Sequence, residues 1–129
     1  MAGNTITQRT LHGGGSDKYI IRSIHIVSDG SEETDLVIYD NSTLINNVTR
    51  GSLVDVKMIG DSCNIRLEWD QTTDAPIISA DPSSYVNFSF SDFGGIRNPA
   101  GTGATGDIVM TTADLDSGDE VTIFITVLQ

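Results

Sequence analysis

The feature that most constrains this fold is an alternation of apolar and polar residues with a period of two. In residues 53–59 the apolar side chains alternate with Asp55 and Lys57, and residues 64–70 repeat the pattern. Successive side chains of a β-strand point to opposite faces, so each segment predicts a strand with one buried and one solvated face. The side chains expected to point inward are Val54, Val56, Met58, Ile65, Leu67 and Trp69.

The whole chain reads as strands separated by turns. Gly, Asp, Asn and Ser punctuate it, and Gly60-Asp61-Ser62 predicts a hairpin turn. Sustained helical periodicity is missing, and the best helical candidate, residues 42–48, is weakened by two asparagines. These features predict an all-β fold, a single antiparallel β-sandwich or jelly-roll-like barrel. The expected strands cover residues 18–28, 35–39, 53–59, 64–70, 85–91, 108–112 and 121–128, and the expected core contains Val56, Leu67, Trp69, Phe88, Phe90, Ile123 and Ile125.

The N-terminal segment differs from the rest of the chain. Residues 1–17 are polar and end in Gly13-Gly14-Gly15-Ser16, which is typical of a flexible hinge. We therefore expect a flexible N-terminal arm over residues 1–17 and a sandwich domain over residues 18–129. Residues 5–11 have enough β-propensity to add a strand to a neighbouring subunit, so that use of the arm stays open.

Net charge restricts the class of partner. The chain carries 18 Asp and Glu residues against 7 Lys and Arg residues, a formal charge of −11. Such a surface repels phosphate backbones and anionic headgroups, so neither nucleic acid nor a membrane is expected as a partner. Residues 1–5 lack the basic and apolar regions of a signal peptide, which favours synthesis in the cytoplasm. The single cysteine, Cys63, is expected to be a small buried residue.

A glycine-rich segment satisfies the spacing G-x-G-x-x-G in residues 101–106. That fingerprint binds a dinucleotide when a helix follows the glycines and its N-terminus holds the pyrophosphate. Here residues 108–112 are β-branched and predict a strand. We therefore expect no nucleotide and no other cofactor, and interpret the segment as an ordered loop that forms a contact surface.

The remaining polar clusters favour structural roles. Asp-rich segments at residues 29–35 and 114–120 are typical of turns, and calcium binding is the alternative interpretation. Glu68 and Asp70 have the spacing of one strand face but share it with Arg66, so a solvated outer face is expected rather than a glycosidase pair. The His12-Gly13-Gly14-Gly15 sequence has no accompanying nucleophile elbow. We predict no catalytic residues, no metal ligands and no enzyme activity.

Two sequence blocks together carry a family resemblance. The first is Arg66-Leu67-Glu68-Trp69-Asp70, and the second combines Phe93-Gly94-Gly95-Ile96-Arg97-Asn98 with Gly103-Ala104-Thr105-Gly106-Asp107-Ile108. From about residue 24 to residue 128 the chain resembles small β-sandwich virion structural proteins of tailed bacteriophages, of the marine and cyanobacterial phage type. The resemblance implies a virion component made in the host cytoplasm. A capsid decoration (cement) subunit is the leading interpretation, bound to the major capsid protein on the outer surface of the head, which it would stabilise.

A decoration subunit is expected to form a homo-oligomer, a trimer or a dimer, and to contact the capsid through the arm and the glycine-rich loop of residues 94–106. Tail, neck and fibre components are alternatives. A glycan-binding adhesion module is another, for which Tyr19 and Tyr39 are the candidate exposed aromatics. The residues singled out for partner contacts are Thr5, Ile6, Thr7, Arg9, Leu11, Gly94, Gly95, Ile96, Arg97 and Asn98.

Overall fold

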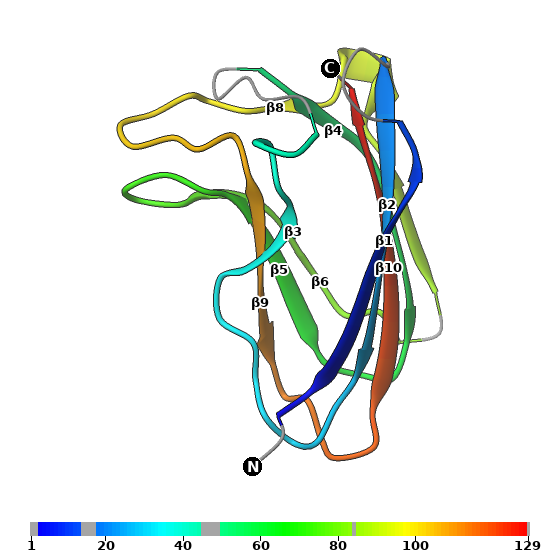
Figure 1. Ribbon diagram of the computed structural model, residues 1–129. Coiled ribbons are helices and arrows are strands. Elements are labelled where there is room, and N and C mark those ends of the chain that lie inside the picture. The colour runs from blue at the N-terminus through cyan, green and yellow to red at the C-terminus, as the bar shows by residue number, and fades with distance from the viewer. Residues whose placement is uncertain (1–2, 14–17, 45–49, 84, 129) are drawn as a thin grey trace.

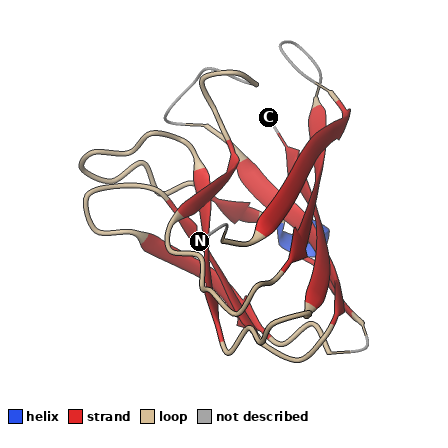
Figure 2. Ribbon diagram, turned by 60° about the horizontal axis from the view of Figure 1, so that its bottom comes forward, coloured by secondary structure: helices blue, strands red, loops and turns tan. Residues whose placement is uncertain are grey.

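The computed structural model describes residues 3–13, 18–44, 50–83 and 85–128. It consists of two antiparallel sheets packed face to face (Figure 1), with one short 3-10 helix among the described residues (Figure 2). The predicted all-β sandwich is therefore confirmed. Within the described part of the chain, no helix is long and apolar enough to cross a membrane.

The larger sheet has six strands and is called the six-stranded sheet. Its order is β1-β2-β10-β4-β7, and the short strand β8 also pairs with β4. The C-terminal strand β10 lies between β2 and β4, so strands from the two ends of the sequence are close neighbours in this sheet. The strands are β1 (Thr5–His12), β2 (Tyr19–Val27), β4 (Ser52–Gly60), β7 (Val86–Ser89), β8 (Ile96–Arg97) and β10 (Glu120–Leu128).

The smaller sheet has four strands in the order β3-β9-β5-β6 and is called the four-stranded sheet. The short helix η1 (Ser91–Phe93) follows β7 and precedes β8. The predicted hairpin at Gly60-Asp61-Ser62 is wrong: β4 and β5 belong to different sheets, so this turn carries the chain from one layer to the other. The strands are β3 (Leu36–Tyr39), β5 (Asn64–Trp69), β6 (Ala75–Ala80) and β9 (Ile108–Ala113).

The core lies between the two sheets and consists mainly of β-branched and aromatic residues. The inward positions of β2, β10, β5 and β9 are fully or almost fully buried, as alternation predicts. Phe88 and Phe90, expected in the core, are only half-buried because β7 is an edge strand; their rings stack on each other with centroids 6.3 Å apart. The largest fully buried side chains include Trp69, Tyr39, Ile24, Met58, Ile65, Leu67 and Met110.

A β-bulge changes which face of β4 one residue occupies. Between Thr126 and Val127 the partner in β4 shifts from Asp55 to Leu53, which leaves Val54 as the extra residue. Leu53 therefore belongs to the core cluster, whereas Val54 lines a depression on the outer face of the six-stranded sheet. Alternation alone predicts the opposite face for Val54, because an inserted residue reverses the side-chain direction on one side of the bulge.

The N-terminal segment is a strand where the sequence predicts a flexible arm. Residues 5–12 form β1, which pairs antiparallel with β2 from Thr5 opposite Val27 to His12 opposite Ile21. Ile6 packs against the core, and Arg22 donates to Gln8 Oε1 at 2.7 Å and to Thr10 Oγ1 at 2.9 Å. The strand therefore belongs to the domain's own sheet. The rest of the predicted hinge, residues 14–16, and most of the helical candidate, residues 45–48, lie outside the described residues.

Candidate functional site

Two loops that project from one end of the four-stranded sheet form the first candidate surface. Residues 70–74 connect β5 to β6, residues 98–107 connect β8 to β9, and together they are called the paired loops (Figures 1 and 2). Main-chain hydrogen bonds join them: Thr72 N–H donates to Thr102 O at 2.9 Å, and Asp70 N–H donates to Asp107 O at 2.9 Å. The loops thus support each other beyond the ends of the strands.

Side chains complete the connection between the paired loops. Thr105 Oγ1 donates to Asp70 Oδ2 at 2.7 Å, and Gly101 N–H donates to Gln71 Oε1 at 3.0 Å. Gly103 has a φ of +77°, and a Cβ there would collide with the Thr72 side chain. The glycines are therefore required by close approach of the two loops, not by a phosphate group.

The base of the paired loops is anchored by a polar cluster beside β3. The Asp107 carboxylate accepts a hydrogen bond from Asn41 N–H at 2.7 Å, and Asn41 Nδ2 donates to Thr105 O at 3.2 Å. Partial burial raises the pKa of Asp107 above its ordinary value, an effect that the hydrogen bond from Asn41 opposes. Burial and the nearby Asp107 carboxylate also raise the pKa of Tyr39, which is fully buried. Tyr39 is therefore unavailable as an exposed aromatic, contrary to the sequence-based expectation.

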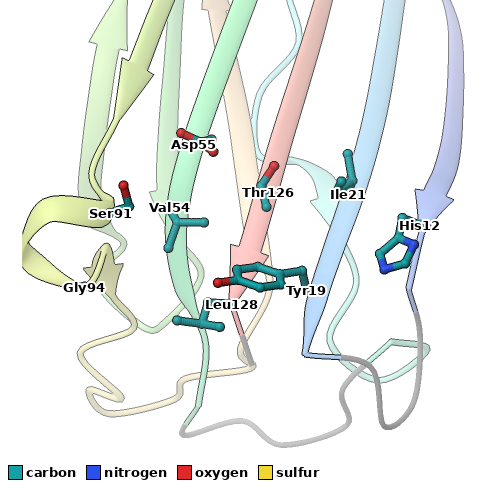
Figure 3. Close-up of a pocket in the computed structure, with 9 residues that line it drawn as sticks. All are labelled: His12, Tyr19, Ile21, Val54, Asp55, Ser91, Gly94, Thr126 and Leu128. Carbon is teal, nitrogen blue, oxygen red and sulfur yellow. The ribbon is translucent and has the colours of Figure 1, made fainter.

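The second candidate surface is a groove on the outer face of the six-stranded sheet (Figure 3). Its central part has a volume of about 580 Å³ and a floor formed by β2, β10 and β4. His12 at the end of β1 stands on one side, and Ser91 and Gly94 stand on the other. The Tyr19 ring, 41% exposed, lies in the groove with Leu128 beside it.

Two smaller depressions extend this central part. One shares Ile21, Asp55 and Thr126 with it and adds Lys57 and Phe124; the other shares Leu128 and adds Arg50 and Arg97. The three depressions adjoin one another through these shared residues and are together called the outer groove. From Lys57 to Ser52, the partner of Arg97, the strand advances by about 17 Å at ~3.3 Å per residue.

The two predicted contact regions share the outer face of the six-stranded sheet. Thr5, Thr7 and Arg9 are on the outer face of the six-stranded sheet, because the neighbouring Gln8 and Thr10 bind the inward-facing Arg22. Arg97 and Gly94 line the groove from the side of β8 and η1. The sequence places these residues in two separate segments, and only the strand order shows that they share one face.

Other predicted contact residues have structural positions. Ile6 packs against the core, and Ile96 of β8 pairs with Leu53 of β4. Gly95 approaches Val54 and the Leu53 carbonyl so closely that a Cβ would collide with them. Asn98 is only 4% exposed, its N–H donates to Gly51 O at 2.9 Å, and its Oδ1 accepts from Ala100 N–H. Leu11 is exposed at the irregularity in the β1–β2 pairing.

The acidic segments show the turn chemistry that their composition predicts. Asp29 Oδ1 accepts from Ser31 N–H at 3.0 Å, and Asp119 Oδ2 accepts from Asp116 N–H at 2.9 Å. The expected solvated face at Glu68 is wrong: Glu68 is 8% exposed, with Arg66 Nε 3.5 Å from its Oε1. Its carboxylate, with those of Asp35 and Asp74, forms a group whose ligand atoms lie within 4.8 Å of one another.

Cys63 has the environment of a structural residue. It is buried in the core cluster, and burial together with Asp81 raises the pKa of its thiol to about 11. A thiol in this state is a poor nucleophile because the thiolate is the reactive form. The expectation of a small buried residue is confirmed.

Comparisons with known proteins give no family assignment. No family model matches the chain, and no curated protein is significantly similar to it. Among solved structures, a CBM4 protein aligns with a TM-score of 0.32 and 10% identity over 85% of this chain and 80% of its own. A family 11 carbohydrate-binding module from Clostridium thermocellum, in complex with a β-1,3-1,4-mixed-linked tetrasaccharide, aligns with a TM-score of 0.31 and 12% identity over 99% and 85%. Similarities this weak carry no functional argument.

Proposed function

We propose that this chain is a non-catalytic structural subunit of a tailed-phage virion, a capsid decoration protein that docks on the outer surface of the head. The observation that carries the proposal is that the two sequence blocks on which the family resemblance rests are in contact in the structure. Asp70 ends the R-L-E-W-D block, and it is hydrogen-bonded to Thr105 and Asp107 of the G-x-T-G-D-I block. The resemblance thus rests on residues that meet in space.

The paired loops are the proposed docking surface. Fixing loop residues in one conformation costs conformational entropy, and these loops offset it with main-chain and side-chain hydrogen bonds. They project beyond the sandwich, and none of the fully buried core residues comes from them. A loop pair held in this way suits recognition of a rigid partner such as a capsid shell. The proposed docking surface therefore consists of residues 98–107, which overlap the second part of the contact loop predicted at residues 94–106, together with their partners at 70–74.

The charge of the paired loops indicates the charge of the surface that they contact. Residues 70–74 and 98–107 contain three aspartates, Asp70, Asp74 and Asp107, and neither lysine nor arginine. The proposed contact on the major capsid protein is therefore neutral or basic where it meets the paired loops.

Homo-oligomer formation is the second part of the proposal. Among the described strands β1 pairs only with β2, so its other edge carries main-chain groups able to pair with a second copy. In a symmetric dimer the same edge of both copies pairs with itself. In a trimer this edge would contact a second, different surface of the neighbouring copy. Analytical ultracentrifugation of the purified protein tests this part: a monomer at micromolar concentration contradicts it.

Co-sedimentation with isolated undecorated capsids, and separately with isolated tails, tests the docking proposal. Saturable binding to capsids alone is the expected result. In the Thr102→Arg variant the new side chain stands on the exposed part of the paired loops, and capsid binding should fall by at least tenfold. Ser117→Arg, an equal charge change at the exposed β9–β10 turn, is the matched control. Binding to tails alone, or to neither particle, contradicts a decoration role.

A further inference from the structure

The outer groove has a charge opposite to that of the molecule as a whole. Three of the seven basic side chains, Lys57, Arg50 and Arg97, line it, whereas Asp55 is the only one of the 18 acidic residues that does so among the described residues. The Lys18 ammonium adds to this group, because its Nζ lies 5.8 Å from the centroid of the Tyr19 ring. The groove is thus a basic strip on an acidic protein.

The basic side chains of the groove are not used to balance neighbouring carboxylates. The ion pairs found among the described residues are His25 with Glu120 and Arg66 with Glu68. Lys57, Arg50 and Arg97 take part in neither, and all three are exposed. They are therefore available for an anionic ligand, with Lys57 at one end of the groove and both arginines at the other.

The middle of the groove is suited to a sugar ring. A pyranose presents a C–H face that packs on an aromatic ring, and Tyr19, the pairing partner of Leu128, offers an exposed ring in the central depression. Thr126, Ser91 and Asp55 place hydroxyl and carboxylate oxygens around it, where sugar hydroxyl groups need partners. Apolar contact from Ile21 and Leu128 completes this amphipathic lining.

A peptide is a poorer fit to the same surface. An extended peptide usually gains its affinity by pairing with the free edge of a sheet. The strands β2, β10 and β4 on the groove floor are each paired on both sides, so their main-chain groups are already occupied. A long polyanion such as nucleic acid is disfavoured by the net charge of −11, whereas a short ligand meets mainly the local charge of the groove.

We propose that the outer groove binds a short acidic oligosaccharide, with sugar carboxylates at Lys57 and at Arg50 and Arg97, and a ring packed on Tyr19. An arginine guanidinium forms paired hydrogen bonds with a carboxylate, which makes the Arg50–Arg97 end the stronger anchor. This activity goes beyond attachment to a capsid and does not depend on it, because the groove lies on the outer face of the six-stranded sheet, whereas the paired loops project from the end of the four-stranded sheet.

Isothermal titration calorimetry with the full chain tests the proposal. The probes are oligosaccharides of galacturonic acid, of alginate and of sialic acid, each compared with a neutral oligosaccharide of the same length. We expect at least one acidic probe to bind at least tenfold more tightly than its neutral counterpart. The affinity of that probe should fall when NaCl is raised from about 50 to about 500 mM, because salt screens the attraction between its carboxylates and the basic side chains.

Paired variants locate the binding site. Arg97→Gln and Lys57→Gln should each weaken binding by roughly tenfold, which corresponds to about 1.4 kcal/mol. Arg66→Gln removes the same charge from the outer face of the other sheet and should leave affinity unchanged. Tyr19→Ala should abolish measurable binding, whereas Tyr85→Ala, at a 54% exposed tyrosine outside the groove, should not.

Three results overturn the inference: no binding by any acidic probe at millimolar concentration, equal binding of neutral and acidic probes, or loss of binding in the control variants but not in the groove variants. Capsid co-sedimentation of the same variants separates this proposal from the decoration role. Groove variants that lose the sugar but keep capsid binding support both proposals, and a protein that binds acidic sugars but no capsid retains only this one.

Discussion

The paired loops and the outer groove differ in the chemical groups that form them. The loops consist of backbone, glycine and hydrogen bonds between main-chain groups, whereas the groove consists of side chains that stand on strands already paired. The loops are acidic and the groove is basic. A surface made of backbone depends on conformation, so its residues affect folding as well as contact. A surface made of side chains on a rigid sheet can change its chemistry with little effect on stability.

The largest expected effect is at a loop glycine. Gly106 is buried with a φ of +81°, and a Cβ there would lie 2.7 Å from Asn41 Cγ. Gly106→Val combines backbone strain with a clash and should lower the free energy of unfolding by about 2–4 kcal/mol. Urea unfolding measures it. Gly94→Ala at the groove wall is the comparison, because open space surrounds that Cβ position and only the strain of its positive φ remains. Equal losses in both variants would remove the difference between the two surfaces.

A smaller effect is expected where a side chain connects the paired loops. Thr105→Val keeps the volume of the side chain but removes two hydrogen bonds of Thr105 Oγ1, the 2.7 Å bond that it donates to Asp70 Oδ2 and the 3.2 Å bond that it accepts from Asp107 N–H. The free energy of unfolding should fall by about 1–2 kcal/mol, which is typical of two partly exposed hydrogen bonds. Thermal and urea unfolding check the value. An unchanged stability would show that water replaces the threonine hydroxyl without cost.

The pH dependence of stability should reveal the base of the paired loops. The pKa of Asp107 is raised in the folded state, so its protonated form favours folding. The stabilisation from this group is fully present below its ordinary pKa of 3.8 and is lost as pH rises through the folded value. Asp107→Asn keeps an oxygen acceptor for Asn41 N–H but does not titrate. Its stability relative to the original protein should therefore increase as pH rises from below 3.8 through the folded pKa. Urea midpoints at a series of pH values test this sign, and a decrease would contradict it.

The smallest effects on stability are expected in the groove. Lys57→Gln changes an exposed side chain outside any ion pair among the described residues, so unfolding free energy should change by less than about 0.5 kcal/mol. The same variant should weaken acidic-sugar binding strongly. Measuring both properties on one preparation tests whether binding and folding are separable here. A large loss of stability would show that the groove also depends on conformation.

The fold could be predicted from local patterns where one face of a strand is buried. Residues 64–70 and 121–128 alternate because each faces the core on one side only, and both form strands there. Local patterning does not indicate strand β6, because residues 75–80 contain a proline and lack a clear alternation. Pro76 is tolerated since β6 is an edge strand, where one set of main-chain groups needs no partner. The sequence predicts an arm in place of strand β1, because the pairing of β1 depends on the free edge of β2, which is not visible in any local pattern.

The candidate surfaces could be predicted only in part. The sequence predicts that the glycine-rich segment is an ordered loop followed by a strand, and β9 begins at Ile108 as expected. Its partner, the loop at residues 70–74, could not be found without knowing that β5 and β9 are neighbours. The sequence does not indicate the outer groove, because its residues come from five strands and one short helix and because a bulge turns Val54 toward it. The alternation of charges along the sequence gives no indication that basic residues collect on one face.

The solitary buried thiol makes this protein convenient for site-specific labelling. Cys63 is the only cysteine in the chain, is almost inaccessible in the folded state and holds its proton at neutral pH. A maleimide dye should therefore react with a newly introduced surface cysteine while leaving Cys63 unmodified, so that no cysteine-free background is required. Fluorophores placed singly at Thr102 or at Thr126 would then report separately on the two surfaces within one otherwise unaltered molecule.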